Sequence, residues 1–231
     1  MNDSSYSMSK RRMEWDINVE MYPDPCGMVG RPVSSHEFSC LIEDIKEKLN
    51  INSIKVVGRR FLDVGCGNSF LLSKIKNGMM PFGIDFSVAM IKKAREIMPE
   101  AGLIIGEINA LPYADNVFDR VLCYNTFHHF PSEEYAMKTI KELVRVCKEG
   151  GYIMIGDIPS SKHKNKLTVE ELKRYSQSNR PGIHRLDKWM FYDLEILLKL
   201  IESLKCAGQI LYQPKNLKSS HYRLDIAARK L

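Results

Sequence analysis

Two acidic residues and two glycines are the groups in this sequence whose types and spacing point most clearly to chemistry. Asp63 precedes Gly65 and Gly67 at the end of an apolar run, residues 61–64, which predicts a buried strand closed by a tight glycine turn. Its carboxylate is a poor neighbour for a pyrophosphate and a good one for an ammonium group. Asp85 ends a second short apolar segment, where an acid can accept hydrogen bonds from both hydroxyls of a ribose.

The elements that must position these residues form a nucleotide-binding corner. Residues 70–76 are predicted to continue from the glycine turn as a helix, with Ser69 as its N-cap. A strand, a glycine turn and a helix in this order are typical of a doubly wound α/β sheet. A dinucleotide enzyme would have a third glycine where Phe70 stands, so the pattern disfavours a nicotinamide oxidoreductase.

Further motifs along the chain resemble those of the class I S-adenosylmethionine-dependent methyltransferases, of the type that acts on small molecules. Residues 103–107 read as a third strand ending in an acid, residues 120–125 as a fourth strand, and residues 143–157 as a helix, a glycine turn and a fifth strand. The match covers about residues 58–158. It implies an α/β fold with a doubly wound, seven-stranded, mostly parallel sheet, an antiparallel last strand and a helical N-terminal cap.

The resemblance also implies how the chain is organised. Residues 1–57 are expected to form the cap, or lid helices, and residues 58–231 the S-adenosylmethionine-binding domain. A segment at about residues 159–192 is expected to be a basic insertion that forms part of the substrate lid.

In this family the acid–glycine turn serves the methionine half of the cofactor S-adenosylmethionine. Asp85 would hold the ribose, Glu107 the adenine amino group, and the backbone amide of Ile108 the adenine ring. The backbone carbonyl of Asn125 would contact the ammonium group. The implied set of cofactor-binding residues is therefore Asp63, Gly65, Gly67, Asp85, Phe86, Glu107, Ile108 and Asn125.

Two histidines are the candidate catalytic residues. His128 and His129 follow the fourth predicted strand at its carboxyl end, where open α/β sheets place their ligands. A histidine has a suitable intrinsic pKa for a general base that deprotonates the methyl acceptor. The alternative is that these histidines only pack beneath the cofactor or bond a backbone carbonyl. Methyl transfer requires no metal, and none is predicted.

The chain has a net charge of +6, and most of the excess lies in the expected insertion. Residues 160–189 contain eight lysines and arginines but only three acidic residues. An ordinary solvated surface and an electrostatic funnel for an anionic acceptor both fit this composition. For the second case, Arg180 and Arg185 are candidate clamps and His184 a candidate contact. Nucleic acid is disfavoured, because the few aromatic residues are not interleaved with the basic ones.

Length and composition are those of one ordinary globular domain with attachments. The chain has 231 residues, of which 44% are hydrophobic, and no apolar run approaches the roughly 20 residues of a membrane span. Its six cysteines are scattered without a C-x-x-C pair, which predicts neither a disulfide nor a zinc site and favours a cytoplasmic location. Nothing in the sequence indicates an oligomeric state.

Three functions fit these motifs. The first is a methyltransferase that transfers a methyl group to a small-molecule acceptor by in-line displacement. The second is a regulatory protein that binds S-adenosylmethionine without catalysis. The third is an RNA or protein methyltransferase. This function would predict an Asn-Pro-Pro-Tyr-like tetrapeptide after the fourth strand, whereas residues 126–129 read Thr-Phe-His-His.

Overall fold

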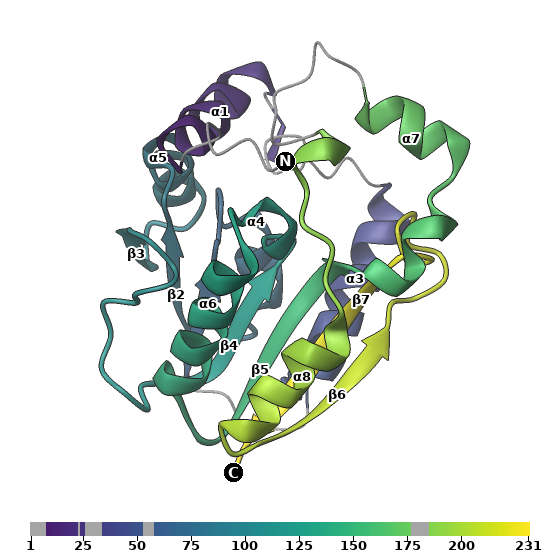
Figure 1. Ribbon diagram of the computed structural model, residues 1–231. Coiled ribbons are helices and arrows are strands. Elements are labelled where there is room, and N and C mark those ends of the chain that lie inside the picture. Colours follow the sequence, from purple (N-terminus) through teal and green to yellow (C-terminus); the bar gives the residue numbers. More distant parts are fainter. Residues whose placement is uncertain (1–7, 23, 26–33, 53–57, 177–184) are drawn as a thin grey trace.

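The computed structural model describes residues 8–22, 24–25, 34–52, 58–176 and 185–231 (Figure 1). Arg180 and His184, which the sequence suggested as substrate contacts, lie outside these residues. No helix in the described ranges is long and apolar enough to cross a membrane.

A single seven-stranded sheet forms the centre of the molecule, in the order β3-β2-β1-β4-β5-β7-β6. Neighbouring strands from β3 to β5 are parallel, whereas β7 runs antiparallel to both β5 and β6. This arrangement confirms the predicted fold, including the inserted antiparallel last strand. The strands are β1 Arg60–Val64, β2 Met80–Asp85, β3 Gly102–Ile105, β4 Phe118–Tyr124, β5 Cys147–Pro159, β6 Cys206–Tyr212 and β7 Arg223–Lys230.

Helices cover both faces of the sheet (Figure 1). The apolar sides of α6 and α8 pack with one face of the strands, and those of α3 and α4 with the other. The α-helices are α1 Met8–Met21, α3 Ser35–Lys48, α4 Phe70–Ile75, α5 Val88–Ile97, α6 Glu133–Val146, α7 Val169–Tyr175 and α8 Leu194–Ser203. Short 3-10 helices are η1 Phe127–His129, η2 Ser161–Lys166 and η4 Leu186–Lys188.

Serine side chains cap the starts of three helices. Ser34, Ser87 and Ser132 accept backbone hydrogen bonds at the starts of α3, α5 and α6. Ser69 was predicted to do the same for α4, and this is wrong. Its φ of 58° is left-handed and its side chain makes no capping bond. Asn68 Oδ1 instead accepts from Phe70 N at 3.2 Å, because the tight turn before α4 uses the left-handed region at Ser69.

The strand order determines at which end of the sheet, and between which strands, a ligand site is expected. The chain runs outward from β1 to β3 and then returns to β4 on the other side of β1, so the crossovers diverge between β1 and β4. Open α/β sheets bind ligands outside the carboxyl ends of the strands at such a point. Helices α1 and α7 lie above this end of the sheet (Figure 1).

Candidate functional site

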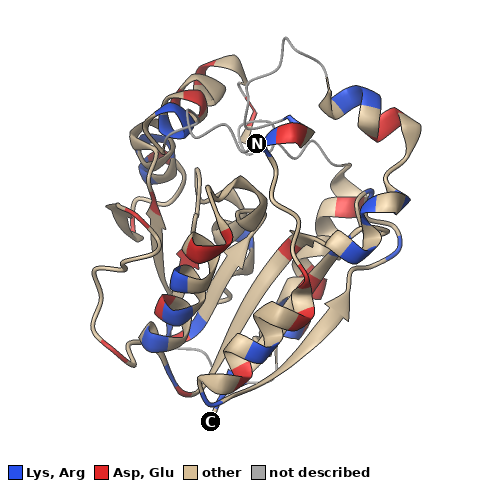
Figure 2. Cartoon of the chain, viewed as in Figure 1, with Lys and Arg blue, Asp and Glu red and all other residues tan. Residues whose placement is uncertain are grey.

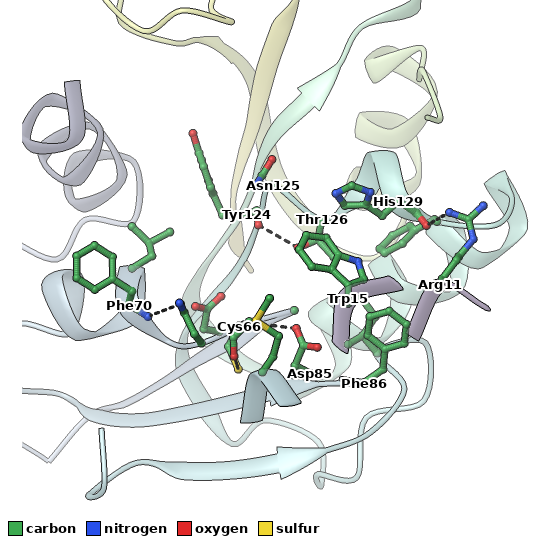
Figure 3. Close-up of a pocket in the computed structure, with 18 of the residues that line it drawn as sticks. Arg11, Trp15, Cys66, Phe70, Asp85, Phe86, Tyr124, Asn125, Thr126 and His129 are labelled. Atoms are coloured by element: carbon green, nitrogen blue, oxygen red, sulfur yellow. Dashed lines mark hydrogen bonds between the residues drawn. The ribbon is translucent and has the colours of Figure 1, made fainter. Parts of the chain in front are cut away.

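A cavity opens at the carboxyl ends of β1, β2 and β4, between the sheet and helix α1 (Figure 3). It is also lined from α3, the start of α4, η1 and α6. All the predicted cofactor residues except Glu107 line it: Asp63, Gly65, Gly67, Asp85, Phe86, Ile108 and Asn125. The structure therefore brings residues from three strand ends to one space.

The glycine turn after β1 leaves backbone rather than side chains facing this cavity. Gly65 has a φ of +77°, and a Cβ on it would lie 2.6 Å from Oγ1 of Thr126. Gly67 has a φ of +50°, and its amide donates to Oδ2 of Asp85 at 2.9 Å. The second amide bond to Asp85 comes from Ser87 N at 2.9 Å. Any side chain at position 65 would therefore clash with the side chain of Thr126, which follows β4.

The two acids lie buried beside each other in the cavity. Asp63 is 3% exposed and Asp85 7%. Burial, and secondarily the charge of Asp85, raises the pKa of Asp63 to about 7. Burial also raises the pKa of Asp85 to about 6, against the lowering effect of the amides of Ser87 and Gly67.

The surroundings of Asp63 show whether the cavity fits the expected cofactor. Within the described part of the chain no group donates a hydrogen bond to its carboxylate, although the side chain is buried. A buried carboxylate without a donor is costly, and a cationic amine is the ligand that relieves it. The amino group of S-adenosylmethionine has this chemistry, so the donor set at this turn fits the cofactor.

Glu107 lies just outside the cavity lining and is held by two neighbours. It accepts a hydrogen bond from the hydroxyl of Tyr135 at 2.8 Å and pairs with Arg12 at 3.5 Å. The guanidinium of Arg12 also lies 5.9 Å from the ring centre of Phe86. The third predicted strand ends at Ile105, so Glu107 follows β3 rather than ending it.

Helix α1 covers the cavity through residues that the sequence did not single out as a group. Arg11 is 7% exposed and donates to the carbonyl of His129 at 2.6 Å. Trp15 packs edge-on against the His129 ring at 5.0 Å. Asp16 accepts a hydrogen bond from the hydroxyl of Ser87 at 2.6 Å. These contacts join α1 to two of the loops that carry the cofactor motifs.

The structure separates the two candidate histidines. His129 lines the cavity, whereas His128 is 3% exposed and does not. The His128 ring packs edge-on against Trp189 at 4.8 Å, and its Nδ1 lies 3.5 Å from Nη1 of Arg223. Arg223 is itself buried and forms an ion pair with Asp157 at 2.7 Å. His128 therefore belongs to the packed interior and His129 to the site.

No residue in the described part of the basic segment lines the cavity. Its described basic residues are interspersed with acidic residues along the chain (Figure 2). Lys162 pairs with Glu195 at 2.7 Å, Arg174 with Glu170 at 3.2 Å, and Arg185 with Asp187 at 2.9 Å. The segment also fixes η1, because Met190 N donates to the carbonyl of His128 at 3.0 Å.

No group of three or more metal-ligating side chains occurs within the described ranges. The described cysteines, at positions 40, 66, 123, 147 and 206, are all free thiols.

Comparison with known proteins finds a family match over the strands that build this site. Residues 62–155 match the family model described as "Methyltransferase domain". The chain is 31% identical over 136 residues to "Probable tRNA methyltransferase 9B" of Bos taurus, covering 54% of this chain and 29% of that protein. It is 31% identical over 103 residues to "Demethylmenaquinone methyltransferase" of Renibacterium salmoninarum, covering 44% of this chain and 42% of that protein. The chain thus spans less than half the length of these curated relatives.

A solved structure shares the whole fold. Magnesium protoporphyrin IX methyltransferase from Synechocystis PCC 6803, with bound SAH, superposes with a TM-score of 0.62 over 100% of this chain and 97% of that one, at 16% identity. The domain match and the shared fold confirm the resemblance that the motifs suggested. Residues 62–155 therefore match a methyltransferase domain, within a fold that the chain shares with a solved methyltransferase.

Proposed function

We propose that this protein is an enzyme that transfers a methyl group from S-adenosylmethionine to a small-molecule acceptor by in-line displacement. The observation that carries the proposal is the buried Asp63 carboxylate, which has no donor in the described structure and shares one cavity with Asp85 and His129. A binding site for a cationic nucleoside and a candidate base thus face the same space.

The proposed cofactor contacts use residues of the cavity lining, together with Glu107 just outside it. Asp63 neutralises the amino group, and the backbone carbonyl of Asn125 accepts a second hydrogen bond from it. Asp85 accepts from the ribose hydroxyls, while its bonds to the turn amides keep its carboxylate fixed. Phe86 and Ile108 flank the adenine, and Glu107 receives the adenine amino group.

When bound, the cofactor supplies a methyl group on a positively charged sulfur, which departs as a neutral thioether. The protein's own task is to align the acceptor with that bond and to exclude water. Trp15 and Arg11 on α1 form the cover that excludes water. We assign the base role to His129, which would take the proton that the acceptor loses, and a positioning role to His128.

We also propose the domain organisation suggested by the motifs. Residues 1–57 act as a cap, which the contacts of Arg11 and Asp16 with the motif loops support. Residues 58–231 act as the cofactor-binding domain. The insertion at about 159–192 supports the turn that bears the histidines, through Met190 and through Tyr192, whose hydroxyl donates to the carbonyl of Phe127 at 2.8 Å.

Enclosure of the cavity favours a small acceptor over RNA or protein. A macromolecular acceptor would have to reach His129 past α1. Of the described basic residues in the segment, Lys162, Arg174 and Arg185 are paired with acids and are thus less available to guide RNA. The demethylmenaquinone methyltransferase likeness supports a small acceptor. The tRNA methyltransferase likeness keeps RNA as the second candidate.

The test is transfer of a labelled methyl group. The protein is incubated with methyl-labelled S-adenosylmethionine and either a metabolite extract or total tRNA. The proposal predicts label in the small-molecule fraction and none in tRNA. Label in tRNA would establish the second candidate, and tight cofactor binding without any transfer would indicate a regulatory protein.

A further inference from the structure

The cavity has a second, apolar end that the cofactor contacts leave unassigned. Figure 3 shows Phe70 at one end and Phe86 at the other, with Cys66 and Asp85 between them. The proposed adenine contacts lie at the Phe86 end, and the polar contacts of the cofactor lie in the middle. The unassigned lining residues are Phe38, Leu41, Phe70, Leu71 and Tyr124, hereafter the aromatic arm.

Three elements build the aromatic arm. Phe38 and Leu41 come from α3, Phe70 and Leu71 from the first turn of α4, and Tyr124 from the last residue of β4. The rings of Phe38 and Phe70 stack at 5.2 Å with an interplanar angle of 17°. Phe38, Phe70 and Leu71 are each only partly buried, so apolar surface faces the cavity. Flat apolar ligands gain most from such a surface.

The charged residues of the cavity lining also distinguish neutral from anionic acceptors. In the described lining of the whole cavity the formal charges are one cation, Arg11, and two carboxylates, Asp63 and Asp85. Arg11 is engaged by the carbonyl of His129 and lies at the far side from Phe70 (Figure 3). The ammonium of Lys74 is 5.3 Å from the Phe70 ring, but this residue is exposed and does not line the cavity. The described lining therefore gives an anionic acceptor no cationic partner at this end.

We propose that the methyl acceptor is a neutral, ring-bearing, largely apolar small molecule whose ring occupies the aromatic arm and whose reacting atom extends from the arm toward the sulfur and His129. This rests on the proposed function, because it assumes that the acceptor shares the cavity with S-adenosylmethionine. It replaces the anionic acceptor suggested by the basic segment, whose described residues lie outside the cavity.

The test compares two probes that share a fused aromatic ring and differ in charge: 2-naphthol and 2-naphthoate. Each is titrated by calorimetry into the protein saturated with S-adenosylhomocysteine. We expect 2-naphthol to bind and 2-naphthoate to bind at least about 10-fold more weakly, because the carboxylate must be desolvated without a cation. Phe70→Ala and Phe38→Ala should each weaken 2-naphthol binding about 10-fold.

Matched variants separate the possible failures. Phe191→Ala removes the same ring from the insertion, under Lys164, and should leave 2-naphthol binding unchanged. Phe70→Leu serves if an alanine variant fails to fold, and should weaken 2-naphthol binding by a smaller factor. Equal or tighter binding of 2-naphthoate, or no binding of 2-naphthol, overturns the neutral acceptor. If S-adenosylhomocysteine itself does not bind, the proposed function fails, and the aromatic arm fails with it.

Discussion

Replacing Asp63 by asparagine should make the cofactor-free protein more stable and cofactor binding weaker. Asp63 is buried, and no group in the described structure donates to it, so its negative charge opposes folding. A carboxyl group whose pKa rises from 3.8 to about 7 costs the folded state up to about 4 kcal/mol once it is ionised at pH 8. The asparagine amide is also buried without a partner, at about 1–3 kcal/mol. A net gain of up to about 1–3 kcal/mol remains.

The pH dependence has a definite sign. The pKa of Asp63 is higher in the folded protein than in the unfolded chain, so the folded state binds more protons between about pH 4 and pH 7. Stability of the cofactor-free wild type should therefore fall as the pH rises through this window. The Asp63→Asn variant should show a smaller fall, because it lacks the contribution of Asp63. Some fall should remain, because the pKa of Asp85 is also raised, to about 6.

Urea unfolding at pH 5 and pH 8 measures the stability, and calorimetry at pH 8 measures the affinity for S-adenosylmethionine. We expect affinity to drop about 10- to 100-fold in Asp63→Asn, because a charge-assisted bond to the amino group is lost. Asp115→Asn, the same change at an exposed acid paired with Arg145, is the control and should alter neither quantity much. An Asp63→Asn protein that is less stable than the wild type at pH 8, or that binds the cofactor normally, would refute the reasoning.

Three further variants test the remaining residues. Asp85→Ala should weaken S-adenosylmethionine binding by about 1.5–3 kcal/mol in calorimetry, because both the ribose contacts and the bond that fixes the glycine turn are lost; unchanged affinity would remove Asp85 from the ribose site. His129→Ala should lower turnover about 10²- to 10⁴-fold with little change in cofactor affinity, whereas His128→Ala should mainly lower the unfolding midpoint; the opposite pattern would reverse the two roles. Gly65→Ala should lose cofactor binding, because its Cβ would lie 2.6 Å from a hydroxyl of Thr126; normal binding would show that the turn relaxes freely.

The sheet and the cofactor turn could be predicted because their signals are local. Apolar runs that end near Asp63 and at Asp85 marked β1 and β2, and the glycine turn marked the start of α4. The prediction for Ser69 failed because the sequence does not distinguish a serine in a left-handed turn from a serine that caps a helix. Its φ depends on how the glycine turn closes over β2, through the bond from Gly65 N to Ile84 O at 2.8 Å.

The sequence suggested a helical cap, but the contacts that hold α1 over the site could not be predicted, because they join distant parts of the chain. Arg11 donates a hydrogen bond to the carbonyl of His129, which lies 118 positions further along the chain, and no sequence pattern marks that pair. The difference between His128 and His129 has the same origin. Adjacent residues in a 3-10 turn point in different directions, and only the packing of Trp189 and Arg223 decides which one is buried.

The most direct measurement of the central claim is a crystal structure of the protein with S-adenosylhomocysteine. The account predicts the amino group within hydrogen-bond distance of the Asp63 carboxylate, the ribose hydroxyls on Asp85, the adenine between Phe86 and Ile108, and the aromatic arm left open beside the sulfur. A ligand bound elsewhere, or one whose amino group turns away from Asp63 while that carboxylate stays without a donor, would contradict it.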